Sequence, residues 1–556
     1  MNRLILSAIL ILNFTFTAIG QNTVGLLSFD FSQQFDGYNL MYPHNQPSVF
    51  LLNNCGEIVH TWEDDADFRP GNVAELMPNG DLVKAKRPSA VTGNPIWAGG
   101  GGAIVEIRTW DNDLLWTFER NDSLDRLHHD IAVMPNGNIL MIVWELKTAE
   151  EAIQAGRDSS LLSQGKLWPD YIIEVEPIGE DSFNIAWEWH VWDHLVQDYD
   201  SEKDNFGVVA DNPGLVDINF QTNDGKADWL HTNSIDYNEE LDQIIISTPF
   251  LSEVWMIDHT TTTEEAAGHT GGFYGMGGDL IYRWGNNQVF DQGTAEDQQL
   301  FGQHDAHWID AYLSGSQPQV GKIAVFNNNL GDGTYSAAQI FEPVYLMYDQ
   351  EYEKDGSVFA PANFDWTYVH PDTVPMQSSG LSGMQILPNG NTLIGVGRRG
   401  YAFEINLDEE IVWEYRTPLA GGIPATQGDT LNINQNLTFR FNRIPMDYAA
   451  FDGRDLSPKG FIELEPDTEF CDMTSSSEDL EKNTTTYIYP NPASQDLTIE
   501  WMSGGKGLID VFDVQGRKVY HDYGYGGRAY LDVSDWHTGL YFVRVNGNSV
   551  GKVFVN

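Results

Sequence analysis

The turn Met77-Pro-Asn-Gly-Asp-Leu-Val83 recurs as Met134-Pro-Asn-Gly-Asn-Ile-Leu140 and as Leu387-Pro-Asn-Gly-Asn-Thr-Leu393. Asn-Gly between two apolar runs predicts a tight β-hairpin in which both central positions have positive φ. A second pair of apolar runs follows each of these turns, for example residues 103–110 before residues 115–118. Each repeat therefore predicts two hairpins, or four strands, which is the content of one propeller blade.

Repeats of this kind predict blades at residues 73–120, 127–190, 229–285, 304–368 and 378–417. A sixth blade is predicted to be shared, with strands from residues 48–62 and from residues 437–465. Joining both ends of the repeat region in one blade leaves no open sheet edge. The expected fold class is all-β, a six-bladed β-propeller followed by a small C-terminal β-sandwich.

The two cysteines, Cys55 and Cys471, fall one in each half of the shared blade. An exported chain with two cysteines predicts one disulfide. We expect this bond to close the ring.

The N-terminus carries an export signal. Residues 1–20 combine a basic start at Arg3 with an apolar run and small residues before position 21, which predicts a cleaved signal peptide. The apolar run is short for a membrane span. We expect a signal peptide at 1–20, the propeller at 21–472, a polar linker at 473–486 and a C-terminal domain at 487–556.

The formal charge of -51 arises from 81 acidic and 30 basic residues. Such a charge argues against partners that are nucleic acids or anionic membrane surfaces. It predicts a solvated acidic surface. An anionic substrate would therefore need positive or donor groups inside its site.

Three segments that open repeats carry histidine: Leu127-His-His-Asp-Ile131, Asp228-Trp-Leu-His-Thr-Asn-Ser-Ile-Asp236 and Gln303-His-Asp-Ala-His-Trp308. Residues 378–384 occupy the equivalent position at the start of a repeat, but they carry small side chains instead of histidine. In a radial arrangement the equivalent strand starts meet at one end of a central channel. The candidate site residues are His128, His129, His231, Asn233, His304 and His307, with Asp130 and Asp305 beside them.

Three kinds of site use such residues. Histidine and aspartate bind metals, and His304 with His307 and one aspartate offers such a set, although the spacing matches no metal signature and we expect no metal. A neutral imidazole can instead act as a nucleophile while its neighbours hold an anionic group. In the third interpretation the histidines only satisfy hydrogen bonds around a water-filled channel.

Over residues 48–472 the chain resembles the bacterial aryl-sulfate sulfotransferases, which are exported six-bladed propellers. The resemblance lies in residues 127–130, 229–235, 302–307 and 323–329. It implies transfer of a sulfuryl group from a phenolic sulfate donor to a phenol acceptor, without a cofactor.

By the same resemblance, His304 is the nucleophile that becomes transiently sulfated. His231, Asn233 and either His129 or His128 would hold the sulfuryl oxygens, and Trp229 and Trp308 are candidates to stack the phenol rings.

One position departs from the family. An arginine is expected after the His-x-Asn segment, and Pro249 stands in its place. Proline cannot replace a guanidinium that grips sulfate. We expect Arg398 to substitute, ahead of Arg399, Arg440 and Arg443. The alternative is a ligand-binding or adhesion propeller without catalysis, and a metal-dependent lyase or hydrolase is third.

The tail resembles the C-terminal sorting domain of the type IX secretion system. The resemblance lies in Tyr489-Pro-Asn-Pro-Ala493, Val511-Phe-Asp-Val-Gln-Gly-Arg517, Gly539-Leu-Tyr-Phe-Val-Arg-Val545 and Lys552-Val-Phe-Val-Asn556. It implies passage through the type IX machinery and a secreted or cell-surface protein.

Overall fold

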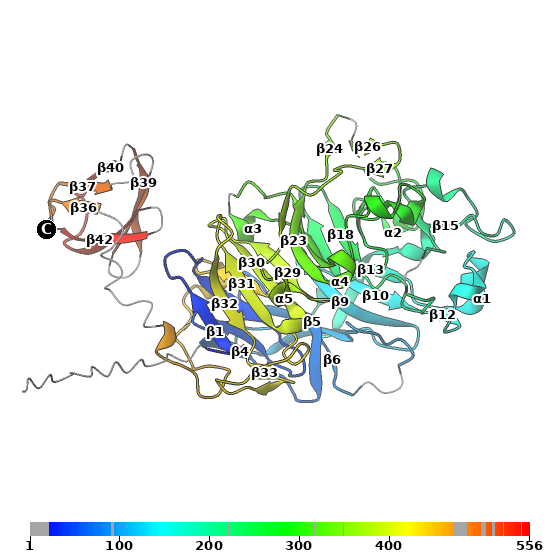
Figure 1. The fold of residues 1–556 in the computed structure, drawn as a ribbon, viewed down its shortest axis with the longest axis horizontal. Coiled ribbons are helices and arrows are strands. Elements are labelled where there is room, and N and C mark those ends of the chain that lie inside the picture. Colours follow the sequence, from blue (N-terminus) through cyan, green and yellow to red (C-terminus); the bar gives the residue numbers. More distant parts are fainter. Residues whose placement is uncertain are drawn as a thin grey trace, which may run out of the picture. The chain divides into compact units, whose positions relative to one another are not determined.

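The computed structural model describes residues 22–90, 94–220, 223–315, 317–348, 350–471, 486–501, 507–513, 517–525, 527–545 and 548–555. The predicted signal peptide lies outside these residues, and so does the predicted linker up to residue 485, whereas Thr486 begins a strand. The described chain consists of strands with a few short helices, which confirms the all-β class (Figure 1). It divides into two compact units: Met1–Ser28 with Gln34–Pro466, and Phe29–Gln33 with Asp467–Asn556.

The described part of the first unit contains six antiparallel sheets of four or five strands each. Within each sheet, strands lie side by side in chain order, except that β35 joins β2 and β1 joins β32 from the opposite end of the repeat region. The first three are β35 (Asn442–Pro445), β2 (Gly37–Met41), β3 (Val49–Leu52) and β4 (Ile58–Trp62); β5 (Phe68–Leu76), β6 (Leu82–Pro88), β7 (Ile104–Arg108) and β8 (Leu114–Glu119); and β9 (Asp125–Val133), β10 (Ile139–Glu145), β13 (Asp170–Ile178) and β14 (Ser182–His190).

The other three sheets are β17 (Ser234–Asn238), β18 (Gln243–Thr248), β19 (Glu253–Asp258) and β20 (Tyr282–Trp284); β21 (His304–Trp308), β22 (Ile323–Asn329), β23 (Tyr335–Phe341) and β28 (Trp366–Tyr368); and β29 (Gly383–Ile386), β30 (Thr392–Val396), β31 (Tyr401–Ile405) and β32 (Ile411–Arg416) with β1 (Gly25–Phe29). These sheets follow the predicted repeats closely.

Short strand pairs and helices lie in the segments that connect the strands of the six sheets. Two-stranded pairs are β11 (Lys147–Thr148) with β12 (Lys166–Leu167), β15 (Leu195–Val196) with β16 (Val216–Asp217), β24 (Tyr345–Leu346) with β25 (Glu351–Tyr352), β26 (Lys354–Asp355) with β27 (Val358–Phe359), and β33 (Leu419–Ala420) with β34 (Ile423–Pro424). The α-helices are α1 (Ala149–Gln154), α2 (Thr263–Ala266), α3 (Ala311–Ser314), α4 (Leu330–Gly333) and α5 (Thr373–Met376). None of the helices among the described residues is long and apolar enough to cross a membrane.

The Asn-Gly turns join strands as predicted, but their backbone differs from the prediction. Only the glycine has positive φ, at 90° for Gly80, 90° for Gly137 and 91° for Gly390. The asparagine side chain accepts a hydrogen bond from the backbone N–H two residues later, as at Asn79 with 2.9 Å. The loop is therefore one residue longer than a two-residue hairpin, with the glycine forming the bulge.

The first strands of successive sheets contact one another, β5 with β9, β9 with β17, β17 with β21 and β21 with β29. Gln385 of β29 then exchanges hydrogen bonds of 2.9 and 2.8 Å with the backbone of Arg443 in β35. Separate apolar clusters fill the space between neighbouring sheets, for example Val105 and Trp116 against Met141 and Ile173. Figure 1 shows the sheets in chain order from blue through green to yellow.

The two ends of the repeat region meet in one sheet. β35 near the C-terminal end pairs with β2, which confirms the sharing of strands predicted for residues 48–62 and 437–465. β1 and β2 were not predicted, because no Asn-Gly turn precedes or follows them. Cys55 and Cys471 are both disulfide-bonded, as predicted.

The second unit has two antiparallel sheets. They are β36 (Thr486–Tyr489), β37 (Asp496–Trp501) and β40 (Arg528–Asp532), and β39 (Lys518–Gly524), β38 (Gly507–Asp513), β41 (Gly539–Val545) and β42 (Asn548–Val555). Both sheets contribute apolar side chains to one core, including Ile499, Val511 and Val543. This two-sheet arrangement is the one expected of the tail.

A buried ion pair joins the sheet that contains both ends of the repeat region to the neighbouring sheet. Arg443 of β35 pairs with Glu404 of β31, and both side chains are fully buried. Arg443 Nε also donates to Asn39 Oδ1 at 2.9 Å, and the backbone N–H of Phe35 donates to Glu404 Oε1 at 2.7 Å. The pair therefore connects β2, β31 and β35.

We predict that Arg443→Met lowers the free energy of unfolding by about 3–5 kcal/mol, because it leaves the Glu404 carboxylate buried without its partner. Urea denaturation measures the loss. Lys322→Met is the control, since Lys322 forms a more exposed pair with Glu342 and Asp365. The control should lose less than about 1 kcal/mol. Equal losses in the two variants would contradict the role of Arg443 in joining β2, β31 and β35.

Candidate active site

A left-handed backbone residue recurs at the strand starts that carry histidine. The φ angle is 51° at His129, 58° at His231 and 61° at Asp305. This conformation is uncommon for residues other than glycine. The register of β9 shifts opposite Met141 and Val143, and that of β21 shifts between His304 and His307. The bulges turn side chains out of the strand alternation.

His129, His231 and His304 come together, although they belong to separate sheets. The rings of His129 and His231 have centroids 4.4 Å apart and are tilted by 73°. His231 lies close enough to His304 to lower the pKa of that imidazole. His304 in turn helps to lower the pKa of His129. The structure therefore assembles the predicted histidine cluster.

His304 is held as a neutral imidazole. Its Nδ1 lies 2.9 Å from Asn328 Oδ1, and the Asn328 amide nitrogen donates to the carbonyls of Ser378 and Leu381 at 2.8 and 3.0 Å. Because these bonds fix the amide, Nδ1 carries the hydrogen and Nε2 keeps its lone pair. Burial lowers the pKa of His304 to about 3. Asn328 lies within residues 323–329, but no sequence pattern indicates this orienting role.

His231 has the opposite electrostatic setting. Its Nδ1 lies 2.6 Å from Asp228 Oδ2, and its side chain is 17% exposed. Burial opposes the charged form, but the carboxylates of Asp228 and Asp170 outweigh it and raise the pKa of His231. Phe250 stacks on the ring with centroids 4.6 Å apart. Among the three clustered histidines, His231 is therefore the one whose protonated form is favoured by neighbouring carboxylates.

Of the two adjacent histidines, His129 is the one beside His231. His128 stacks on Trp144 with ring centroids 3.9 Å apart, and its Nε2 lies 3.4 Å from Asp170 Oδ1. The Nδ1 atoms of His128 and His129 are 2.9 Å apart. His128 therefore lies behind His129 and positions it. Burial and the neighbouring histidines hold the pKa of His129 well below its usual value.

A glycine makes room for His129. A Cβ on Gly100 would lie 2.0 Å from His129 Nε2, and the φ of Gly100 is 78°. The backbone N–H of His129 donates to the Gly100 carbonyl at 2.8 Å. The sequence reasoning missed Gly100, because its contact depends on the tertiary fold.

Asn233 is fully buried and hydrogen-bonds to the residue before His304. Its amide nitrogen donates to the carbonyl of Gln303 at 2.8 Å, and its Oδ1 has no hydrogen-bond partner. Because Gln303 precedes His304, this bond helps to fix the start of β21. The structure thus places Asn233 against the chain of the predicted nucleophile.

Two of the four candidate arginines, Arg398 and Arg440, lie near the histidine cluster, and Arg440 helps to lower the pKa of His129 and of His304. A Cβ on Gly380 would lie 3.3 Å from Arg398 Nη2 and 3.7 Å from His304 Cε1. Arg398 Nη1 donates to Asn434 at 3.0 Å, whereas its buried Nε has no partner. The other three have different contacts: Arg399 bonds to Gln377, Arg440 pairs with Asp130 and Asp305, and Arg443 pairs with Glu404.

The predicted aromatic platforms are packing residues. Trp229 is fully buried and donates to the Phe220 carbonyl at 2.9 Å. Trp308 is 6% exposed and belongs to the apolar cluster between two sheets. Phe250, which follows Pro249, stacks on His231, and the rings of Trp144 and Phe439 also lie beside the cluster.

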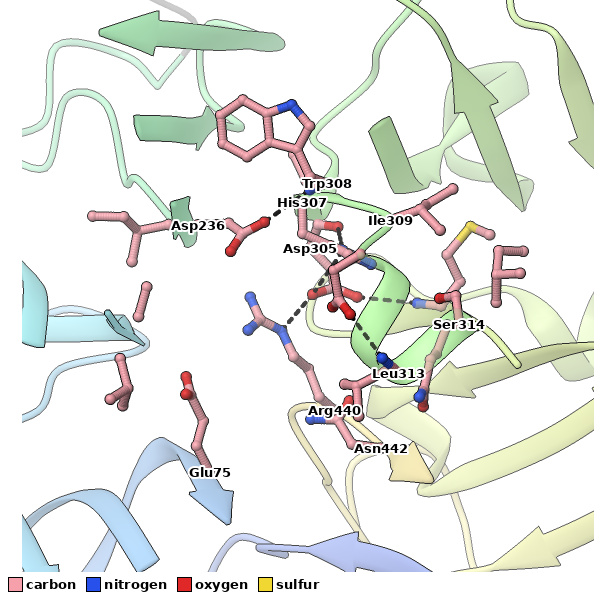
Figure 2. Close-up of a pocket in the computed structure, with 18 of the residues that line it drawn as sticks. Glu75, Asp236, Asp305, His307, Trp308, Ile309, Leu313, Ser314, Arg440 and Asn442 are labelled. Atoms are coloured by element: carbon pink, nitrogen blue, oxygen red, sulfur yellow. Dashed lines mark hydrogen bonds and ion pairs between the residues drawn. The ribbon is translucent and has the colours of Figure 1, made fainter. Parts of the chain in front are cut away.

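An ion-pair network lies between the histidines and a cavity of about 170 Å³ (Figure 2). Arg440 lies 2.6 Å from Asp305 Oδ1, and its Nη1 donates to Asp130 at 3.1 Å. It lines the cavity together with Glu75, Asp236 and His307, whereas His129, His231 and His304 do not. His307 is thus separated from the cluster. Burial raises the pKa of Glu75 to about 8 and that of Asp236 to about 6.

Comparison with known protein families identifies the family to which the chain belongs. The family described as Arylsulfotransferase (ASST) matches residues 44–344, more than half of the 556 residues. The chain belongs to the arylsulfotransferase family. Family membership supports sulfuryl transfer at the level of the family. No protein of curated function matches the sequence.

A second family, described as Secretion system C-terminal sorting domain, matches residues 487–555 of this arylsulfotransferase-family protein. The domain indicates that the protein is exported to the cell surface or secreted, and it implies the type IX machinery as a partner. Both resemblances found in the sequence are thereby confirmed.

Solved structures with a similar trace are distant in sequence. A protein of unknown function from Bacteroides caccae is 11% identical, with 74% of this chain and 99% of that chain covered and a TM-score of 0.38. The periplasmic gluconolactonase of Pseudomonas aeruginosa is 10% identical, with 73% and 99% covered and a TM-score of 0.32. A streptogramin B lyase is 9% identical, with 75% and 97% covered and a TM-score of 0.31.

The low pKa of His304, about 3 against 6.5 for a free imidazole, predicts a loss of stability in acid. Between these pH values the unfolded chain binds the proton and the folded chain does not, so stability falls as pH falls. His304→Asn should make the decline shallower by up to about 1.4 kcal/mol per pH unit. Urea unfolding from pH 6.5 to pH 4 measures the slope.

Proposed function

We propose that this protein is an exported aryl-sulfate sulfotransferase that transfers a sulfuryl group between phenols through a sulfated His304. The proposal rests on two neighbouring histidines whose pKa values are shifted in opposite directions, lowered at His304 and raised at His231. His304 is neutral with Nε2 free to attack, and His231 beside it is favoured in its protonated form by Asp228. We also infer that the six sheets are the six blades of a β-propeller, which the successive contacts of their first strands support.

The first half-reaction breaks the ester. Nε2 of His304 attacks sulfur, a nitrogen–sulfur bond forms, and the bond from sulfur to the phenolic oxygen breaks. His231 gives its proton to the departing phenolate, which leaves readily because a phenol has a pKa of about 10. The enzyme then carries a sulfated His304 and a neutral His231.

The second half-reaction reverses these roles. The acceptor phenol gives its proton to His231 while its oxygen attacks sulfur, and the nitrogen–sulfur bond breaks. The products are the new aryl sulfate and the regenerated enzyme. Because the first phenol leaves before the acceptor reacts, the kinetics are ping-pong.

Positive groups must hold the sulfuryl oxygens, because the chain as a whole is strongly acidic. Arg398 lies beside His304 with a buried Nε that has no partner, and this supports its role in place of the arginine missing at Pro249. Donors arranged before the reaction stabilise charge as it shifts in the transition state. His129 and the amide of Asn233 complete the proposed set.

We predict that His304→Ala abolishes release of 4-nitrophenol from its sulfate ester in the presence of a phenol, while the melting temperature stays nearly unchanged. Wild-type enzyme incubated with the ester alone should gain about 80 Da on His304, the mass of one sulfuryl group on the nucleophile. Intact-mass and peptide analysis detect the adduct. His307→Ala is the matched control on the same strand and should retain turnover.

Folded wild-type protein that releases no phenol with several acceptors, and gains no mass, would refute the sulfotransferase proposal. The remaining interpretation would then be a ligand-binding propeller in which Pro249 marks the loss of catalysis.

We predict that Arg398→Ala reduces kcat by about 10²–10³-fold, the loss typical of a donor removed from a developing anion. Arg398→Lys should recover part of the activity, because it restores the charge but not the planar fork. Steady-state kinetics with the same ester measure both variants. Arg399→Ala is the matched control, since the neighbouring Arg399 bonds to the carbonyl of Gln377 at 2.8 Å. Equal losses at both positions would contradict the assignment.

A further inference from the structure

Two histidines and an aspartate converge outside the candidate active site. Asp279 Oδ1 lies 2.8 Å from His194 Nδ1 and 2.7 Å from His269 Nδ1. All three atoms lie within 4.8 Å of one another. His194 follows β14, whereas His269 and Asp279 lie in the long connection between β19 and β20. The cluster therefore joins two segments that are far apart in sequence.

His194 Nε2 already has a hydrogen-bond partner. His194 Nε2 lies 2.8 Å from the carbonyl oxygen of Ala266. A carbonyl oxygen only accepts, so Nε2 carries the hydrogen and the lone pair of a neutral ring is on Nδ1. That lone pair faces Asp279 Oδ1, which is also an acceptor. The contact requires either a second proton on His194 or a cation between the two atoms.

The surrounding side chains fix the ring of His194. It is fully buried and stacks on Trp189 with centroids 5.6 Å apart and an angle of 5°. Trp189 Nε1 donates to the carbonyl of Gly278 at 2.7 Å. A histidine that ligates a metal usually donates its other ring N–H to a carbonyl or carboxylate in this way. The site thus has the donor atoms for a metal and also the hydrogen bond that typically orients a metal-binding histidine.

We propose that His194 Nδ1, His269 Nδ1 and Asp279 Oδ1 bind one zinc ion. Two imidazole nitrogens and one carboxylate oxygen form a donor set that zinc accepts, with water in the fourth position. The His269 side chain is 58% exposed, so this position has access to solvent. Tetrahedral bonds of about 2.0–2.2 Å require each histidine nitrogen to lie about half an ångström farther from Asp279 Oδ1. The partly exposed side chains of Asp279 and His269 can make this shift while His194 stays in place.

The ion would fasten a connection that has little regular structure of its own. Between β19 and β20 the only helix is the single turn α2, and six glycines lie between residues 268 and 278. Gly278 approaches the site so closely that a Cβ there would lie 2.1 Å from the Ala266 oxygen and 2.6 Å from His194 Nε2. Zinc would therefore link this connection to the segment after β14.

The test is zinc binding by the full-length protein, purified without a histidine tag and stripped with a chelator at pH 7.5. Calorimetry with zinc chloride should give about one tight site per chain, and cobalt(II) should give the visible absorption of a four-coordinate site. His269→Ala should lose this site, and so should Asp279→Asn. The exposure of His269 lets the first variant keep its fold.

His259→Ala is the matched control. The two ring nitrogens of His259 lie 2.7 Å from Asp242 and 3.1 Å from Glu174, with no second histidine among these contacts. This variant should bind zinc like the wild type. Zinc should also slow proteolysis within residues 267–279 in the wild type and in His259→Ala, but not in His269→Ala.

Absence of tight zinc binding in the folded wild type would overturn the proposal and leave His194 as a doubly protonated ring beside Asp279. Undiminished binding in both His269→Ala and Asp279→Asn would overturn it as well, since the zinc would then lie elsewhere. Neither result bears on His304, so the sulfotransferase proposal is tested independently.

Discussion

The structure depends on aspartates that join the first strand of one sheet to the first strand of another. Asp130 accepts the backbone N–H of Ile235 at 3.1 Å, and Asp305 accepts that of Met384 at 3.0 Å. Asp236 likewise accepts the N–H of Trp308 at 2.8 Å. A side-chain carboxylate thus provides the acceptor that a neighbouring strand would provide within a sheet. The sheets are held at a fixed spacing where their first strands meet.

This constraint explains why the histidines meet. Asp130 and Asp305 directly follow His129 and His304 in the chain. At two of these contacts a left-handed residue accompanies the carboxylate, His129 before Asp130 and Asp305 itself, whereas Asp236 makes the same kind of contact without one. Such residues typically cost about 1–3 kcal/mol each and persist where the surroundings hold them. Arg440 neutralises both carboxylates and completes that support.

The sequence predicted the parts of the fold that local chemistry determines. The Asn-Gly turns recur with apolar runs on both sides, so the four-stranded repeats and the sharing of strands between the ends could be inferred. β1 could not, because it pairs with the distant β32, and β2 could not, because no Asn-Gly turn marks its pairing with β3. The sequence also could not distinguish His128 from His129, since the bulge in β9 breaks the alternation by which strand faces are assigned.

Other residues of the site could not be identified from the sequence, because their roles also depend on the tertiary fold. Asn328 and Gly100 act on His304 and His129 through contacts between separate segments. The residues His194, His269 and Asp279 have no recognisable metal spacing, because a long irregular connection brings them together. A pattern along the chain shows which residue types are present, whereas the tautomer and charge of each imidazole depend on neighbours that only the fold provides.

The charge balance at the histidine cluster gives a reason why Pro249 is compatible with sulfate chemistry. Arg440 is compensated by two carboxylates, and the charge of protonated His231 is compensated by Asp228. His304 and His129 are neutral, because burial and neighbouring positive groups lower the pKa of each. An incoming sulfate ester therefore needs a cation that is not already neutralised. Arg398 hydrogen-bonds to the neutral Asn434 and has a buried Nε without a partner, so it can supply that charge from a different sheet.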